Sequence, residues 1–360
     1  MRVVVAPDKF AGTMSAADAA DTIAAGWCST RPDDEVLVVP MADGGAGTLD
    51  VVATAVAGAE RVEAEVADAR GRARAAHWLA LPDGRALLEA AEACGLAWLD
   101  EDDRDPRCAT SYGVGQLIAA ATDAGVREIL IGLGGSATSD GGAGMALALG
   151  HRLLRADGNG VKVGAEHLVE LARVEPVAAG TAPVTIVSDV TNPLLGPDGA
   201  VAVFAPQKGA GPADLPVLED ALRRFADVVE RDLPGGPWRE LPGAGAAGGL
   251  GFGLLAFCGG RMADGAEVVA GLVDLDARMR SADVVIAGEG KLDDQTLSGK
   301  TPAFVAQRAR AAGARVLAIA GQVEGRGAEL FDEVAVLGEE GLDRPVELTR
   351  QRAAELASTM

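Results

Sequence analysis

Aromatic side chains are scarce in this sequence. Phe, Trp and Tyr make up 3% of its 360 residues, although 49% of the residues are hydrophobic. The core must therefore consist mainly of Ala, Val, Leu and Ile, and the 48 glycines add many positions without a side chain. This composition favours an α/β protein over a β-sandwich or a disordered chain, and the length suits about two domains.

Positive charge is also scarce, because 32 Lys and Arg residues stand against 53 Asp and Glu residues, for a net charge of −21. A nucleic-acid partner needs clustered cations, so we expect none. No apolar run approaches the roughly 20 residues that span a bilayer, so we expect no membrane contact. The opening "MRVVVAPDKF" reads as a strand and a turn rather than a secretion signal, and we therefore expect a cytoplasmic protein.

Cysteine and histidine are too few and too scattered to form the usual metal or nucleophile patterns. The four cysteines show no CxxC pair and no zinc-type spacing, which predicts free, buried thiols. Each of the three histidines stands alone in its stretch of sequence. We therefore expect structural rather than catalytic histidines.

Apolar strands alternate with helices at both ends of the chain. The run at 2–7 predicts a buried parallel strand, and 15–30 predicts a helix that begins at the N-cap Ser15. Between 61 and 91 the apolar period changes to two, which predicts antiparallel hairpins and a domain boundary. Further along, the patterns predict a helix over 111–125, two strands within 184–211, a helix over 214–231, and a strand-helix-strand-strand series over 281–338.

The predicted fold class is α/β with two domains. Residues 1–62 and 283–360 would form a Rossmann-like parallel-sheet domain, and residues 63–282 would form an inserted mixed-sheet α/β domain.

Five loops that follow apolar strands combine glycine or proline with an acid, a lysine or both. They are "APDKFAGT" (6–13), "PMADGGAGT" (40–48), "GLGGSATSDGGAG" (132–144), "SDVTNP" (188–193) and "AGEGKLDDQTLSGKTP" (287–302). The carboxyl ends of strands line the ligand crevice in open α/β sheets, and free N–H groups in such loops bind oxyanions. One such loop is explained as well by tight packing, but five favour an anionic, phosphorylated ligand.

Lysine is confined to few positions, since the chain has only Lys9, Lys162, Lys208, Lys291 and Lys300. All except Lys162 lie in Gly/Pro-rich loops, which makes them candidates for phosphate or carboxylate contacts. Acids gather in the same loops: Asp8, Asp43, Asp140, Asp189, Glu289, Asp293 and Asp294. Phosphoryl transfer needs carboxylates to hold Mg²⁺ and to accept a hydroxyl proton, although turn formation explains any single Asp equally well.

Six stretches, in this order along the chain, resemble the type I glycerate kinase family: "VVVAPDKFAGTMSA", "MADGGAGTLD", "GLGGSATSDGGAGMALALG", "SDVTNPLLGPDGAVAVFAPQKGA", "PGAGAAGGLGFG" and "GEGKLDDQTLSGKTPAFVA". The resemblance implies a kinase that uses ATP and Mg²⁺ to phosphorylate D-glycerate at the 2-position. It also implies an active site in the cleft between two domains. The 3-phosphate product or another small hydroxy acid remains open, as does a monomer or a homodimer.

One stretch departs from the family pattern. Many relatives read Pro-Asp-Ser-Phe-Lys in the first loop, whereas this chain reads "PDKFAG". The lysine therefore precedes Phe10 and Ala11 follows it, so the reach of Lys9 differs from that of the shifted lysine.

Combined with the resemblance, the loops predict four groups of site residues. The catalytic group, in which Asp189 accepts the hydroxyl proton and the lysines neutralise phosphoryl charge, is Asp189, Lys291, Lys9 and Asp8. The substrate- and phosphate-binding group is Gly134, Gly135, Ser136, Ala137, Thr138, Ser139, Asn192, Lys208 and Lys300. The nucleotide-binding group is Gly288, Glu289, Gly290, Gly44 and Gly45, and the metal group is Asp43, Asp140 and Asp293.

Two other function classes are weighed against the kinase. A nicotinamide oxidoreductase would need G-x-G-x-x-G after a strand, and that spacing occurs only as Gly243, Gly245 and Gly248, after a Pro-containing loop. A non-catalytic binding protein for a sugar acid would share the fold without turnover.

Overall fold

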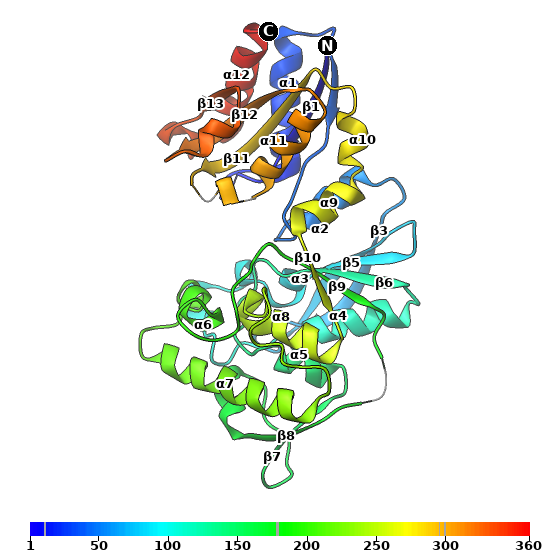
Figure 1. Cartoon of the computed structure of the whole chain (residues 1–360), viewed down its shortest axis with the longest axis vertical. Helices are drawn as coiled ribbons and strands as arrows, with labels where there is room; N and C mark the ends of the chain where they lie inside the picture. Colours follow the sequence, from blue (N-terminus) through cyan, green and yellow to red (C-terminus); the bar gives the residue numbers. More distant parts are fainter. Residues whose placement is uncertain (11, 178–179, 295, 299) are drawn as a thin grey trace. The chain divides into compact units, whose positions relative to one another are not determined.

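The computed structural model describes residues 1–10, 12–177, 180–294, 296–298 and 300–360. They form two compact units (Figure 1). Unit 1 comprises residues 1–43, 50–57 and 265–360, and unit 2 comprises residues 44–49 and 58–264. Residues 265–282 therefore pack with the two ends of the chain, whereas the sequence prediction assigned them to the inserted domain.

Unit 1 contains a parallel sheet with strand order β13-β12-β11-β1-β2. Its strands are β1 (Arg2–Pro7), β2 (Glu35–Val38), β11 (Val284–Leu292), β12 (Arg315–Val323) and β13 (Glu333–Val336). Its helices are α1 (Ala16–Thr30), α9 (Gly265–Leu272), α10 (Leu275–Met279), α11 (Thr301–Ala311) and α12 (Pro345–Ser358), and α2 (Thr48–Ala55) runs across the division between the units.

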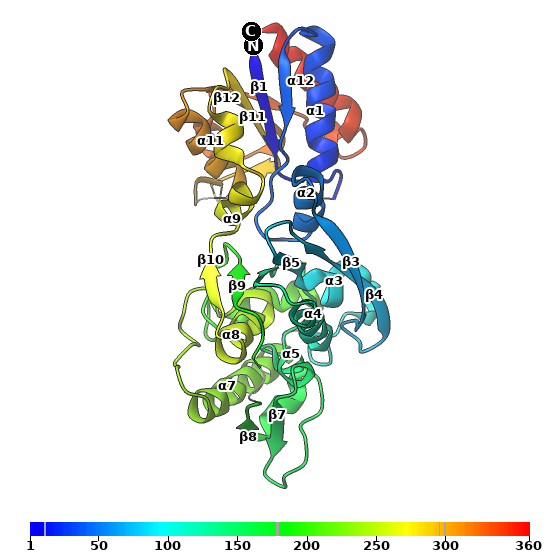
Figure 2. The same cartoon turned by 90° about the vertical axis from the view of Figure 1, so that its right-hand side faces the viewer.

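Helices cover both faces of the unit 1 sheet (Figure 2). Successive strand residues point to opposite faces, so Val3 and Val5 of β1 pack with α1 and α12, whereas Val4 packs with α9, α10 and α11. Trp27 of α1 is fully buried in the first of these layers. The continuous apolar run of β1 is thereby explained, and the predicted Rossmann-like parallel sheet is confirmed.

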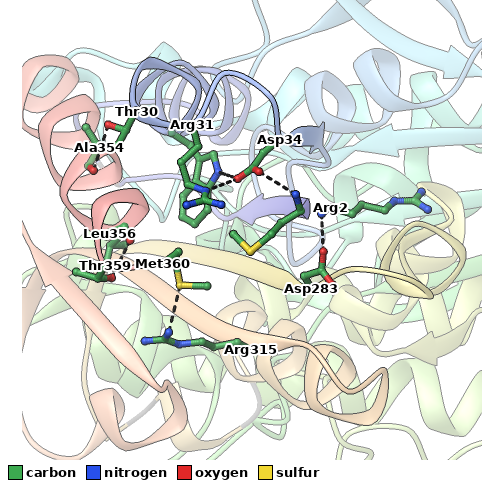
Figure 3. A network of polar contacts seen from close by, with 12 residues as sticks. Arg2, Thr30, Arg31, Asp34, Asp283, Arg315, Ala354, Leu356, Thr359 and Met360 are labelled. Atoms are coloured by element: carbon green, nitrogen blue, oxygen red, sulfur yellow. Dashed lines mark hydrogen bonds and ion pairs between the residues drawn. The ribbon is translucent and has the colours of Figure 1, made fainter.

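A polar network joins the end of α1 to the start of β2 (Figure 3). Asp34 accepts hydrogen bonds from the Met1 amino group at 2.8 Å, from Arg31 Nε at 2.7 Å and from Trp27 Nε1 at 3.0 Å. The amino group first and Arg31 next hold the pKa of Asp34 far below its usual value. At the other end of α1, Ser15 Oγ accepts from Asp18 N at 3.1 Å, so the predicted N-cap is confirmed.

Unit 2 contains a mixed sheet with strand order β10-β9-β6-β5-β4-β3 and a separate hairpin of β7 and β8. Its strands are β3 (Glu60–Ala67), β4 (Ala73–Ala80), β5 (Arg85–Glu89), β6 (Glu128–Gly132), β7 (Arg152–Arg155), β8 (Leu171–Glu175), β9 (Val184–Val187) and β10 (Arg261–Ala263). Its helices are α3 (Ala90–Cys94), α4 (Tyr112–Asp123), α5 (Ala143–Ala148), α6 (Ala200–Phe204), α7 (Asp214–Asp232) and α8 (Ala246–Phe257).

The pairing of these strands determines where the loops of unit 2 meet. Strands β3, β4 and β5 pair antiparallel, as the period-two stretch predicted. Strands β5, β6, β9 and β10 pair parallel, so their carboxyl ends lie at one edge of the sheet. The loops that follow β6 and β9 carry predicted site residues, and the topology brings both loops to this edge.

One predicted strand is wrong. The sequence "AVAVF" within 184–211 was predicted as a second strand, but it forms the helix α6. Its buried positions are Ala200 and Val201, Ala202 and Val203 are exposed, and Ala205 directly after the helix is buried again. That pattern follows a helical repeat rather than strict alternation, and a short apolar run does not distinguish the two by itself.

Within the described part of the chain, no helix is both long and apolar enough to cross a lipid bilayer.

Candidate active site

In unit 1 the strand order reverses between β1 and β11. The chain passes from β1 to β2 on one side, and from β11 through β12 to β13 on the other. Open α/β sheets bind ligands beyond the carboxyl ends of their strands at such a point. Asp8 and Lys9 follow β1 there, and Glu289 lies near the end of the neighbouring strand β11.

Asp8 is buried directly after β1, with 7% of its surface exposed. Its Oδ1 accepts from the Lys9 backbone N at 2.6 Å, and its own N–H donates to Gly288 O at 2.8 Å. Burial raises the pKa of Asp8, and the Lys9 charge opposes that shift. The Thr301 hydroxyl also lowers the pKa of Asp8, although it makes no hydrogen bond of ordinary geometry with a described residue.

The pKa of Glu289 is higher than that of a surface glutamate. Burial raises its pKa to about 7, while the nearby Lys300 charge opposes the shift. Asp8, Asp293 and Asp43 raise the pKa further through repulsion between like charges. Four other predicted site residues of unit 1 therefore lie close enough to Glu289 to influence its charge.

The two other lysines of unit 1 lie in different surroundings. Lys9 Nζ is 3.7 Å from Asp43 Oδ1, inside the acidic group. Lys291 lies at the exposed end of β11, where its Nζ is 2.8 Å from Glu324 Oε2. That pair is open to solvent on both sides, so Lys291 can exchange its partner for a phosphate at little cost.

In unit 2, the loop 134–139 follows β6, and most of its backbone N–H groups have no acceptor among the described residues. The hydrogen bonds of the described residues provide no acceptor for the N–H groups of Gly134, Gly135, Ser136, Thr138 and Ser139. The Ala137 N–H is the exception, since it donates to Cys94 O at 2.8 Å. The prediction that the Ala137 amide binds an anion is therefore corrected, because its donor is already used. Gly135 supplies the positive φ of 78° that the turn requires.

Lys208 lies beneath this loop, on a 3₁₀ turn formed by residues 206–208. Its side chain is buried, with 2% exposure, and Nζ donates to Thr138 O at 2.6 Å and to Ser136 Oγ at 3.3 Å. Burial lowers the pKa of Lys208 to about 8, while Cys94 and Asp140 favour its charged form.

Asp140 lies at the end of the loop and is surrounded by donors from its own unit. Oδ2 accepts from Ser111 N at 2.8 Å, Ser111 Oγ at 2.9 Å and Gly144 N at 3.1 Å, and Oδ1 accepts from Gly142 N at 3.1 Å. Burial raises the pKa of Asp140 and these donors oppose the shift. Because the carboxylate already accepts four hydrogen bonds, this geometry favours support of the loop over metal binding.

Asp189 and Asn192 follow β9 at the same edge of the sheet. Asp189 is exposed. Asn192 holds the turn, because its side-chain Nδ2 donates to the backbone oxygen of Asp198 at 2.8 Å and its backbone oxygen accepts from Gly245 N at 2.9 Å.

Several predicted site glycines have a packing role. A Cβ on Gly288 would lie 3.0 Å from Pro7 Cβ, and one on Gly44 would lie 2.6 Å from Val187 O. Gly45 and Gly290 lie against the backbone of other glycines. A Cβ built on Gly134 would lie 2.6 Å from Gly45 Cα, and a Cβ built on Gly321 would lie 2.4 Å from Gly290 O. These glycines are explained by close approach of loops, whether or not a nucleotide also lies there.

The G-x-G-x-x-G spacing lies in a turn and in helix α8, not after a strand. Ala247, Gly248 and Gly249 have positive φ there, and a Cβ on Gly248 would lie 2.0 Å from Thr138 O. Gly248 therefore permits α8 to pack against the loop after β6. The strand-turn-helix context of a dinucleotide fingerprint is absent from this described segment.

Sequence reasoning missed two polar residues that shape these loops. Glu89 is buried at the end of β5, where it accepts from Leu49 N at 2.7 Å and from Gly47 N at 3.3 Å. Ser111 bonds to Asp140 and accepts from Met145 N at 3.0 Å. An acid at the end of the apolar run "RALLEAA" was the available signal for Glu89, whereas Ser111 had none in sequence.

A model of the glycerate kinase family matches residues 3–355 of the chain. The chain belongs to the glycerate kinase family. It is 38% identical over 349 residues to a protein of Escherichia coli K12 named glycerate 2-kinase, covering 95% of this chain and 89% of that protein. It is 40% identical over 335 residues to a protein of Halalkalibacterium halodurans named glycerate kinase, covering 92% and 88%.

A solved structure agrees with this family membership. A crystal structure from Salmonella typhimurium LT2, provisionally named glycerate kinase 2, superimposes with a TM-score of 0.86 and is 40% identical. The match covers 100% of this chain and 98% of that one. Membership of a kinase family agrees with the anionic ligand predicted from the loops and disfavours the oxidoreductase.

The acids predicted to bind metal do not form a closed metal site. Among the described residues, no group of three or more His, Cys, Asp or Glu side chains could hold a metal ion. A kinase does not need three protein ligands for its metal, because Mg²⁺ is usually held by one or two carboxylates together with the nucleotide phosphates. Asp43 and Asp293, which both influence Glu289, are oxygen donors of the type that Mg²⁺ prefers.

Proposed function

We propose that this glycerate kinase family member transfers the γ-phosphoryl group of ATP to D-glycerate and forms 2-phospho-D-glycerate. The observation that supports this most directly is the loop 134–139 above the buried Lys208, in which every N–H group except that of Ala137 has no acceptor among the described residues. Donors of this kind stabilise an anionic oxygen. The E. coli relative named glycerate 2-kinase supports the acceptor and the position of transfer.

Unit 1 would bind the nucleotide. Asp43 and Asp293 would supply carboxylate oxygens to Mg²⁺ together with the nucleotide phosphates, and the ion would neutralise phosphate charge. Lys9 and Lys291 would approach the phosphoryl oxygens. Lys300, at the start of α11, adds its charge to the positive end of the helix, which also favours phosphate.

Unit 2 would bind the acceptor. Asp189 is exposed at the end of β9, where it can accept the proton of the attacking hydroxyl. The loop Gly134–Ser139 would hold an anionic group, either the acceptor carboxylate or the transferred phosphoryl group. Asn192 would keep the turn after Asp189 in place. That one active site draws on both units stays a prediction, as does a monomeric or homodimeric state.

The direct test is ³¹P NMR of the purified protein with ATP, Mg²⁺ and D-glycerate, because the 2- and 3-phosphates give distinct resonances. We expect the 2-phosphate signal, and its loss when Mg²⁺ is chelated. A 3-phosphate signal would keep the kinase but reverse the acceptor in the site. No phosphorylated product would refute this acceptor and favour another hydroxy acid or a binding protein.

A further inference from the structure

Lys208 is a buried cation that forms no ion pair with a described residue. Among the described residues, its ammonium group donates to two neutral oxygens, the Thr138 carbonyl and the Ser136 hydroxyl. It forms no ion pair with any carboxylate in the described part of the molecule, and the nearby Asp140 is occupied by other donors. A buried charge is costly unless it is paired, so the site is complete only when an anion arrives from outside the chain.

Several donors around Lys208 are also unused. Thr138 Oγ1 and Ser139 Oγ are buried and make no hydrogen bond of ordinary geometry with a described residue, although Thr138 influences the pKa of the Cys94 thiol. Ser136 Oγ accepts from Lys208, which leaves its own proton to donate. Buried polar groups are rarely left unpaired, so these donors point to a ligand.

We propose that the loop Gly134–Ser139 binds the carboxylate of the acceptor, and that Lys208 acts as a positioning residue through the Ser136 hydroxyl. This inference rests on the proposed function, which left two ligands open for the loop, the acceptor carboxylate and the transferred phosphoryl group. It selects the carboxylate. One lysine with neutral donors matches the single charge of a carboxylate, whereas the phosphate ester of the product carries about two charges. The other loop lysines belong to unit 1, to which the proposed function assigns the nucleotide phosphates: Lys9, Lys291 and Lys300.

Two variants test the inference, with a third as the matched control. Ser136→Ala removes one hydroxyl and leaves the buried lysine in place. Lys208→Met removes the charge, and Lys162→Met makes the same change at an exposed lysine of the same unit. Calorimetric binding of D-glycerate and of inorganic phosphate is measured separately for each protein, together with KM for ATP and the melting temperature.

We expect Ser136→Ala and Lys208→Met to weaken D-glycerate binding by about 10- to 100-fold, as for the loss of a charge-assisted hydrogen bond. The kcat/KM for D-glycerate should fall through KM, with kcat within about threefold in Ser136→Ala. Lys162→Met should match the wild type. KM for ATP should not change in any variant.

Two results would overturn the inference. In the first, Ser136→Ala and Lys208→Met bind D-glycerate within twofold of the wild type but bind phosphate more weakly or have a higher KM for ATP. That result would assign the loop to the phosphoryl group. The other is a Ser136→Ala protein with a lowered melting temperature and equal losses for all ligands, which would make the hydroxyl structural. A wild-type protein that binds D-glycerate without forming product would refute the proposed function and leave the carboxylate site standing.

Discussion

At the scale of single residues, two buried charges of unit 2 differ in how they are satisfied. Asp140 accepts four hydrogen bonds from its own unit, whereas the acceptors of Lys208 in the described part of the chain are neutral oxygens. Asp140 therefore stabilises the loop as built, while Lys208 leaves a charge available to a ligand. Asp189 differs from both because its side chain is exposed, and the role proposed for it is that of the base in the reaction.

If Lys208 supports the proposed carboxylate site, acceptor binding should depend on pH. Its pKa is lowered to about 8, so the ammonium is charged below that pH and neutral above it. We expect KM for D-glycerate to rise as the pH passes upward through about 8, and Lys208→Met to lose this inflection. Steady-state kinetics over the alkaline range measure this, with Lys162→Met as control. The same inflection in Lys208→Met would assign it to another group.

Asp189→Asn should lower kcat by at least about 100-fold, because an amide cannot accept the hydroxyl proton. Its melting temperature should stay unchanged, since Asp189 is exposed. Asp198→Asn is the matched control, because Asp198 is an exposed acid of the same turn whose carbonyl, not its carboxylate, bonds to Asn192. Activity within a few-fold of the wild type would exclude Asp189 as the general base.

At the scale of elements, the loop after β6 is held in place by backbone contacts that only glycine permits. Gly134 meets the loop at Gly45 on one side, and Gly248 of α8 meets Thr138 on the other. Three separate segments are thereby packed around one set of N–H donors. The conformation of the loop consequently depends on residues far away in the sequence.

Gly248→Ala should destabilise unit 2 by about 1–3 kcal/mol, because its Cβ would overlap the Thr138 carbonyl and its φ is positive. Gly259→Ala is the control, since Gly259 also has a positive φ but has nothing within 4 Å of the added Cβ. Urea denaturation of both variants separates the steric cost from the backbone cost. Equal losses in the two variants would show that the contact with Thr138 is not tight.

At the scale of the whole molecule, each unit places its charged loops at the carboxyl edge of its own sheet. The parallel order of unit 1 gathers acids and lysines near the β1–β11 junction, and the parallel part of unit 2 gathers the loops after β6 and β9. The stability of unit 1 depends in turn on contacts at the opposite end of its strands. At that end, Asp34 accepts hydrogen bonds from the Met1 amino group, Trp27 and Arg31 (Figure 3).

Asp34→Asn should lower the melting temperature at neutral pH, because the amide loses the charged contacts with the Met1 amino group and Arg31. The pKa of Asp34 is depressed in the folded state, so its stabilisation is present above the unfolded value of 3.8 and is lost as the pH falls below it. The difference from the wild type should therefore narrow progressively in acid. Asp33→Asn, at an exposed neighbour, should show no such difference, and a gap independent of pH would contradict the explanation.

The sequence by itself determined the α/β class, the strand-loop-helix pattern and the family. Apolar period, glycine position and confined lysines are local properties, and local patterns are what a sequence displays directly. It did not reveal that "AVAVF" is helical, that the Ala137 N–H is already bonded to Cys94, or that Glu89 and Ser111 support the loops. Only the tertiary structure decided these points, because hydrogen bonds and burial arise between segments distant in the chain, and so do the pKa values of Lys208 and Glu289.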